Sequence, residues 1–198
     1  MTTEQASVER RAVEAIVLGA FGALTGRHRE PLRYAMMDDT PVGTLGLAAG
    51  ARGLRHLSFV ESEDRFVERL LSEHGDVPIL RSELDDVRRA LDRYFAGRRL
   101  DFSVVVDLNE LPRFQRLVLG ATARIPAGRV ATYTQVAAQA GSPRASRAAG
   151  NALHNNPVAI IVPCHRVLRA DGSLGGYGGG LPIKEWLLAH EGARSGAL

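Results

Sequence analysis

Cysteine is scarce in this chain: Cys164 is the only one among 198 residues. A single cysteine cannot form an internal disulfide. The lack of disulfides favours a reducing compartment, and we predict a cytoplasmic location. Whether this thiol is reactive depends on the residues that surround it.

The chain also lacks a hydrophobic run of the roughly 20 residues that a membrane span requires. Residues 12–24 are rich in apolar side chains and follow Arg10 and Arg11 in the manner of a weak signal peptide, but Glu14 interrupts them. Their helical spacing instead predicts an amphipathic helix, so we expect residues 1–32 to form a helical extension. We expect no membrane partner.

Charge is distributed unevenly along the sequence. Residues 1–112 contain 15 Lys and Arg against 19 Asp and Glu, whereas residues 113–198 contain 10 against 3. The two parts therefore carry −4 and +7, which sum to the net charge of +3. A basic part favours an anionic partner, and nucleic acid is the commonest large one. A solvated basic face that binds nothing is the alternative.

Local patterns predict an α/β protein of two domains. In the first domain we expect strands at residues 33–37, 43–49 and 54–60 and helices at 62–73 and 82–95. An extended segment at residues 100–108 leads to Asn109, where the second domain is expected to begin. We therefore predict an α/β domain over residues 33–108 and a mostly helical domain over residues 109–198.

The second domain contains a helix-turn-helix pattern. Its helices are predicted at residues 112–124, 134–140, 144–154 and 183–190. Ser142 is the predicted N-cap of the third helix, with Pro143 as its first residue. The short turn at Gly141 completes the pattern, although many helical hairpins that bind no DNA share it.

The helix after this turn has one small face, made of Ala145, Ala148, Ala149, Gly150 and Ala152. Small side chains allow close approach to a DNA backbone, whereas reading bases in the major groove would call for more Asn, Gln and Arg. A helix–helix contact is the alternative.

Cys164 lies in the segment Pro163–Val167, between an apolar run and a glycine-rich stretch at residues 172–180. A cysteine attacks as the thiolate, and neighbours such as His165 and Arg166 are of the kind that lower the pKa of a thiol. An inert, buried cysteine is the alternative. The glycine-rich stretch lacks the Gly-Lys-Ser/Thr ending of a P-loop, so we predict no nucleoside triphosphate site.

The ordered motifs around Cys164 resemble those of the O6-alkylguanine-DNA alkyltransferases, also called methylated-DNA–protein-cysteine methyltransferases. The likeness rests on residues 147–157, on Pro163–Val167 and on the glycine-rich loop, all in family order. Residues 39–45 and 94–97 resemble the family's N-terminal domain, which is a ribonuclease-H-like α/β unit. The resemblance implies a winged-helix-like second domain, a monomer without cofactor, and double-stranded DNA with alkylated bases as the partner.

The resemblance also implies a reaction, namely irreversible transfer of the alkyl group from O6-alkylguanine, and from O4-alkylthymine, to Cys164. Glu191 would orient His165, which would take the thiol proton through a bridging water, while Asn156 braces the turn that carries the cysteine. The thioether is stable, so the protein would act once, as a suicide enzyme.

The O6 atom cannot be reached inside a stacked duplex, so the nucleotide must be flipped out. Arg147 matches the family's arginine finger, which fills the gap, and Tyr133 matches the tyrosine that helps to rotate the nucleotide. Gly178 leaves only a backbone N–H in the guanine pocket, which would give room for groups larger than methyl. The resemblance assigns these residues to substrate or DNA binding: Tyr133, Arg147, Ala148, Ala149, Gly150, Arg166, Val167, Tyr177, Gly178 and Gly179.

Some family members hold a structural zinc ion through cysteines in the N-terminal domain, and this chain has none there. His28, His56 and His74 are scattered without ligand spacing, so we predict no metal. Two other functions are alternatives. A DNA-lesion binder without catalysis would lack the reactive cysteine, and a cysteine phosphatase would need an arginine where Ala170 stands.

Overall fold

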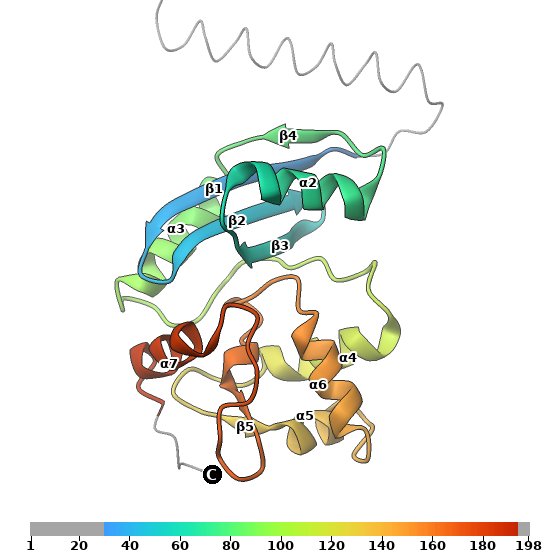
Figure 1. Cartoon of the computed structure of the whole chain (residues 1–198), viewed down its shortest axis with the longest axis vertical. Helices are drawn as coiled ribbons and strands as arrows, with labels where there is room; N and C mark the ends of the chain where they lie inside the picture. The colour runs from blue at the N-terminus through green and yellow to red at the C-terminus, as the bar shows by residue number, and fades with distance from the viewer. Residues whose placement is uncertain (1–29, 194–198) are drawn as a thin grey trace, which may run out of the picture.

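The computed structural model describes residues 30–193, in which a sheet with two helices lies at one end and a mostly helical part at the other (Figure 1). The predicted α/β organisation is therefore present. The helix expected at residues 12–24 lies outside the described residues, and of the predicted extension over residues 1–32 only residues 30–32 are described. No helix in the described range has the length and apolar character to cross a membrane.

The N-terminal part contains β1 (Leu32–Thr40), β2 (Gly43–Gly50), β3 (Gly53–Phe59), α2 (Glu63–His74), β4 (Ile79–Arg81) and α3 (Asp85–Phe95). The sheet has the order β3-β2-β1-β4, with β1 antiparallel to β2 and parallel to β4. The three predicted strands and both helices are confirmed. The prediction was wrong at the start of α3, where Leu84 takes a left-handed conformation before the first turn, and it missed the short strand β4.

Side chains on alternate faces of the sheet meet different helices. On one face, Phe66 and Leu70 of α2 pack against Leu32, Met36 and Ala48. The other face joins α3 to the main core, which continues into the helical part. Ser62 begins α2 by accepting a hydrogen bond from the Arg65 backbone N–H at 3.3 Å.

The C-terminal part contains α4 (Arg113–Ala123), β5 (Ala131–Thr132), α5 (Tyr133–Gln139), α6 (Ser146–His154), the 3-10 turn η1 (Cys164–Arg166), β6 (Val167–Leu168) and α7 (Leu181–His190). The four predicted helices are present. The predicted cap of α6 is wrong, because the backbone carbonyl of Ser142 accepts a hydrogen bond from the Ala145 N–H at 2.9 Å and closes a turn ahead of the helix. Ala145 stands at the N-cap and provides no side-chain hydrogen bond.

Strand β3 joins the two parts through backbone hydrogen bonds. The Leu57 N–H donates to the Pro157 carbonyl at 2.8 Å, and the Leu57 carbonyl accepts from the Ala159 N–H at 2.9 Å. In Figure 1, β3 is the strand on the side of the sheet nearer the helical part. The segment that leads from α6 to Cys164 is thus anchored on the N-terminal sheet.

Candidate active site

Cys164 begins η1, directly after Pro163, and its side chain is partly buried. The Asn156 side-chain amide donates to Cys164 Sγ at 3.2 Å and to the Val162 carbonyl at 2.9 Å. Its carbonyl oxygen accepts from the Val158 N–H at 3.1 Å. Asn156 therefore ties both ends of this turn to the thiol.

A buried carboxylate lies next to the histidine that follows the cysteine. His165 Nε2 is 3.0 Å from Glu191 Oε1, and both side chains are excluded from solvent. An ionised carboxylate can only accept, so we assign the proton to Nε2, which donates to Glu191. The lone pair of the neutral ring is then on Nδ1, a buried atom that has no hydrogen-bond partner among the described residues. Nδ1 is therefore the ring atom that can take up a proton.

Glu191 is held by three further donors. Arg166 donates from Nε to Oε2 at 2.8 Å and from Nη2 to Oε1 at 2.7 Å, in the two-pronged geometry that arginine and carboxylate favour. Tyr94 donates its hydroxyl to Oε1 at 2.8 Å. Burial would raise the pKa of Glu191, but the hydrogen bonds from His165 and Arg166 outweigh it and lower that pKa to about 2. The carboxylate is thus ionised at neutral pH.

The expectation that neighbouring residues lower the pKa of the thiol was wrong. Burial raises the pKa of Cys164, and the hydrogen bond from Asn156 and the charge of Lys184 offset only part of this. Arg166 gives no such help because its charge is directed at Glu191. Burial also lowers the pKa of His165, against the opposing effect of Glu191. The resting site therefore pairs a neutral thiol with a neutral imidazole, and attack by sulfur requires transfer of the thiol proton.

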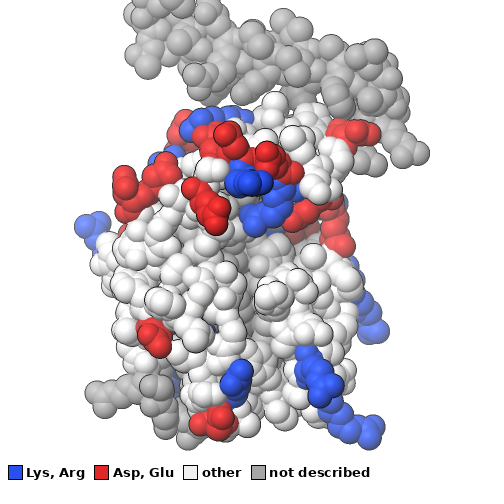
Figure 2. Space-filling view, viewed as in Figure 1, with Lys and Arg blue, Asp and Glu red and all other residues white. Residues whose placement is uncertain are grey.

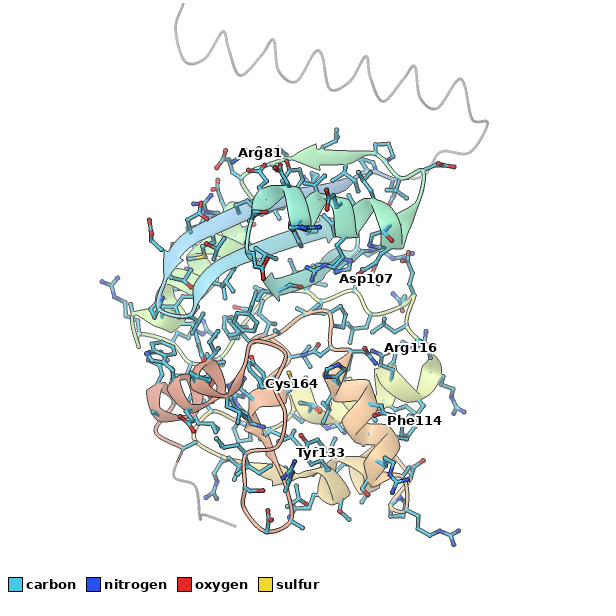
Figure 3. All side chains as sticks on the ribbon, viewed as in Figure 1. Arg81, Asp107, Phe114, Arg116, Tyr133 and Cys164 are labelled. Atoms are coloured by element: carbon cyan, nitrogen blue, oxygen red, sulfur yellow. The ribbon has the colours of Figure 1, made fainter. Side chains whose placement is uncertain are left out.

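The pocket above the thiol consists of two adjoining cavities of about 170 and 250 Å³. Both are lined by Leu153, His154, Cys164, Tyr177 and Gly178. Tyr133 lies at one side, where it packs between α6 and the glycine-rich loop. Figure 3 shows Cys164 on the side of the helical part nearer the sheet, with Tyr133 further from it.

Some predicted contact residues lie outside this pocket. Arg147 and Ala148 are exposed on α6, away from the thiol but open to a partner. Three other predicted contact residues, Ala149, Arg166 and Val167, are buried, with 0%, 5% and 0% of the residue exposed, so their side chains offer almost no outer surface. Ala149 packs in the main core, and Arg166 acts on Glu191 instead.

The N-terminal domain contributes a wall of the site that the sequence did not reveal. Phe59, at the end of β3, lies edge-on to Tyr177 with ring centroids 5.7 Å apart. A Cβ atom at Gly179 would fall 2.7 Å from the Phe59 ring, so glycine is needed for this close approach. Tyr94 comes from the same domain; the motif at residues 94–97 covers it but predicts no contact with the site, and no motif covers Phe59.

Lys184 was also missed, because the helix predicted at residues 183–190 was assigned no role in the site. It is fully buried, and its ammonium group donates to the Val167 carbonyl at 2.7 Å and to the Leu174 carbonyl. Burial lowers its pKa to about 8. A signal was available, since Lys184 is the only lysine in a chain with 25 Lys and Arg. Its bonds connect β6 with the start of the glycine-rich loop.

The view that the histidines are scattered is corrected for two of them. His56 on β3 and His74 at the end of α2 face each other with their Nε2 atoms 2.8 Å apart. His28 lies outside the described residues.

The charge asymmetry is visible on the surface. In the view of Figure 2, acidic side chains gather over the sheet end, interspersed with basic ones, whereas the helical end shows few acidic groups. Helix α6 itself contains no acidic residue, since residues 146–154 include neither Asp nor Glu.

Comparison with known proteins gives the class to which both parts belong. The family described as "6-O-methylguanine DNA methyltransferase, ribonuclease-like domain" matches residues 32–108. The one described as "6-O-methylguanine DNA methyltransferase, DNA binding domain" matches residues 113–193.

Individual relatives agree with this class. A methylated-DNA–protein-cysteine methyltransferase of Methanosarcina acetivorans is 39% identical over 161 residues, which is 81% of this chain and 99% of that protein. The protein of that name from Rattus norvegicus is 35% identical over 180 residues, covering 83% and 84% of the two chains. The crystal structure of Mycobacterium tuberculosis OGT in complex with DNA superimposes with a TM-score of 0.69 at 38% identity, covering 81% of this chain and 92% of that one. The chain therefore belongs to the 6-O-methylguanine DNA methyltransferase family.

Proposed function

We propose that this chain repairs DNA directly, by moving the alkyl group of O6-alkylguanine onto Cys164 in a single turnover. The observation that carries the proposal is the buried set in which Glu191 holds Nε2 of His165 and leaves Nδ1 without a protein partner, one residue away from the thiol. The family membership and the relatives' names support this reading. O4-alkylthymine is a second substrate by the same chemistry.

The proton leaves first in this scheme. Adjacent side chains point in different directions, so a water molecule relays the thiol proton to His165 Nδ1 while Nε2–H stays on the carboxylate. The low pKa of Glu191 keeps a negative charge beside the imidazolium that forms. The hydrogen bond from Asn156 to sulfur stabilises the thiolate.

Alkyl transfer then forms one bond and breaks one. A lone pair of Cys164 Sγ attacks the alkyl carbon, and the electron pair of the carbon–O6 bond leaves with guanine. The guanine anion takes up one proton, for which the Tyr133 hydroxyl is the donor at the side of the cavity, and solvent restores that proton. The sulfur keeps the alkyl group as a thioether, which no described group is placed to hydrolyse.

DNA would bind along α6, the second helix of the helix-turn-helix formed with α5. With the small sheet of β5 and β6, these helices fit a winged-helix-like domain. Arg147 and Ala148 are exposed there, and Gly150 faces Tyr133 at the pocket. Arg147 enters the stack when the nucleotide is flipped toward Cys164, which offsets part of the unstacking cost. We propose a monomer as the active unit, because a single chain is sufficient to supply every catalytic group that this scheme requires.

The test is mass spectrometry of the full chain after incubation with duplex DNA containing O6-methylguanine. We expect one added methyl group per chain, localised to Cys164, and no transfer by Cys164→Ser, which still binds the duplex. Several turnovers per chain, or a methyl group elsewhere, would contradict the proposal. Affinity for DNA should fall as salt rises, because phosphate contacts release counterions.

A further inference from the structure

His56 and His74 form a second cluster of chemically competent side chains, and none of its members serves the alkyl transfer. Their rings are nearly perpendicular, at 85°, and bring the two Nε2 atoms to 2.8 Å. The side chains are only 8% and 11% exposed. They border a solvent-connected cavity of about 550 Å³.

Carboxylates flank both rings. Glu73 lies 3.7 Å from Nδ1 of His56, and Glu110 lies 3.9 Å from Nδ1 of His74. At these distances the carboxylates place negative charge beside the rings without being hydrogen-bonded to them. Between the two rings one Nε2 donates to the other, and a divalent cation would replace the shared proton and take a lone pair from each nitrogen.

The donor atoms are those that a transition metal prefers. One atom each from His56, Glu73 and His74 lie within 4.8 Å of one another, and zinc sites with two histidines and one glutamate keep a further position for water. Bonds of about 2.0–2.1 Å in tetrahedral geometry separate two nitrogens by about 3.3 Å, so the rings need to part by only about 0.5 Å. The Glu73 side chain is 46% exposed and free to turn toward the ion.

Two arginines lie near the site, and both have carboxylate neighbours. Arg55 pairs with Asp107 at 3.2 Å and with Glu110 at 2.8 Å. Arg69 is 4.0 Å from Glu73, at the limit of an ion pair, and its Nε and Nη2 atoms are buried without a hydrogen-bond partner among the described residues. A metal ion must therefore compete with Arg69 for the carboxylate of Glu73, against an ion pair that is weak at this distance.

We propose that His56, Glu73 and His74 bind one divalent transition metal ion of the Zn²⁺ class, joining β3 to the end of α2. The set contains no cysteine and lies wholly within the N-terminal domain, so it is separate from the thiol chemistry. Because β3 also anchors the segment leading to Cys164, the ion stabilises the side of the molecule that supports the active site.

The proposal is tested on the tag-free full chain carrying Cys164→Ser, so that the thiol cannot bind metal. After chelation and dialysis against Zn²⁺, we expect one ion per chain and a higher unfolding temperature than in chelator. His56→Gln or His74→Gln should weaken binding by at least about 100-fold, and Glu73→Gln by about 10-fold. Co²⁺ in place of Zn²⁺ should give the visible absorption of a four-coordinate site.

His154→Gln is the matched control, because His154 borders the same cavity but is no part of the cluster. It should bind Zn²⁺ as tightly as the parent chain. A parent chain that binds no Zn²⁺ would show that the two imidazoles share only a hydrogen bond, and would overturn the proposal. Equal weakening in His154→Gln and His74→Gln would also overturn it. Since Glu73 is on the helix surface, Glu73→Gln keeps the test valid if a histidine variant fails to fold.

Discussion

Tyr94 of the N-terminal domain donates its hydroxyl to Glu191 of the C-terminal domain, at 2.8 Å and across 97 positions of sequence. Tyr94 is fully buried, and burial followed by the charge of Glu191 raises the pKa of its hydroxyl, which stays protonated as a donor. His190 strengthens the same junction through a contact of 2.7 Å between Nε2 and the Tyr94 carbonyl. The N-terminal domain thus supplies a hydrogen bond to the same carboxylate oxygen that contacts His165.

Tyr94→Phe should weaken both the fold and the reaction. The change removes one hydrogen bond to a buried carboxylate, which contributes about 1.5–3 kcal/mol to stability. With one donor fewer, Glu191 orients His165 less firmly, and we expect alkyl transfer to slow by about 3- to 10-fold. Urea unfolding and the single-turnover rate with O6-benzylguanine measure the two effects.

Tyr34→Phe is the control for this substitution. Its hydroxyl also donates to a carboxylate, Glu63, at 2.8 Å, but in a part-buried position within the N-terminal domain. It should lose some stability with no change in the transfer rate. Equal rates for Tyr94→Phe and the parent chain would show that Tyr94 only stabilises the domain junction.

The acid sensitivity of the fold should depend on Glu191. Its pKa is about 2 in the folded chain against an ordinary value of 4.5, so its stabilisation is fully present above pH 4.5 and is lost as the pH falls toward 2. The complete shift of the Glu191 pKa corresponds to roughly 3 kcal/mol of unfolding free energy. The pKa of His165 is lowered too, so the unfolded chain takes up that proton first and stability already begins to decline below about pH 6.5.

This pH dependence is measured by chemical unfolding between pH 8 and pH 3. The difference in unfolding free energy between the parent chain and Glu191→Gln should shrink as the pH falls below 4.5. Glu185→Gln changes an exposed glutamate of the same helix and should leave the parent curve unaltered. A constant difference for Glu191→Gln at all pH values would contradict the assignment of a depressed pKa.

Most of the elements could be predicted from the sequence, because hydrophobic periodicity and turn residues are local signals. Errors arose where the signal was short or where the backbone formed a turn at a residue that also commonly caps helices. The strand β4 has only three residues, and Ser142 closes a turn instead of capping α6. Local residue propensities do not distinguish a three-residue strand from a loop, or a serine that caps a helix from one in a turn.

Site residues were predicted where a family motif covers them. Cys164, His165 and Asn156 lie within nine positions of one another, and Glu191 and Tyr133 were assigned from family matches further away along the chain. Tyr94 and Phe59 reach the site through tertiary packing and were assigned no role in it. For Arg166 the position was right but the role was wrong. A basic residue beside a cysteine was expected to lower the pKa of the thiol, whereas Arg166 forms a buried ion pair with Glu191, which is distant in sequence.

Two neighbouring glycines of the loop should respond differently to alanine. A Cβ at Gly179 would meet the Phe59 ring at 2.7 Å, whereas one at Gly178 has no neighbour within 4 Å. Gly179→Ala should cost about 1–3 kcal/mol, as overpacking does, and Gly178→Ala should stay within about 0.5 kcal/mol. Thermal and urea unfolding report the difference, and Phe59→Leu combined with Gly179→Ala should recover part of the loss. If the two alanine variants were equally stable, the loop would not be packed on β3 as described.

The final prediction separates nucleotide flipping from chemistry, because Arg147 is exposed on α6 whereas Glu191 is buried beside His165. Arg147→Ala removes the side chain proposed to fill the vacated stack, so the unstacking cost of a few kcal/mol is less well offset in duplex DNA. We expect transfer from duplex O6-methylguanine to slow by about 10- to 100-fold. The free base O6-benzylguanine has no stack to leave and should react at nearly the parent rate.

Glu191→Gln should instead slow both substrates alike, because it disturbs the proton relay that both require. Arg144→Ala is the control for charge alone, since Arg144 is exposed in the turn ahead of α6 and should change duplex affinity and its salt dependence more than the transfer rate. The measurement is a pair of single-turnover rates for each variant at saturating substrate. If Arg147→Ala slowed the free base as much as the duplex, its role would lie in the pocket or in folding, and the flipping step would need another residue.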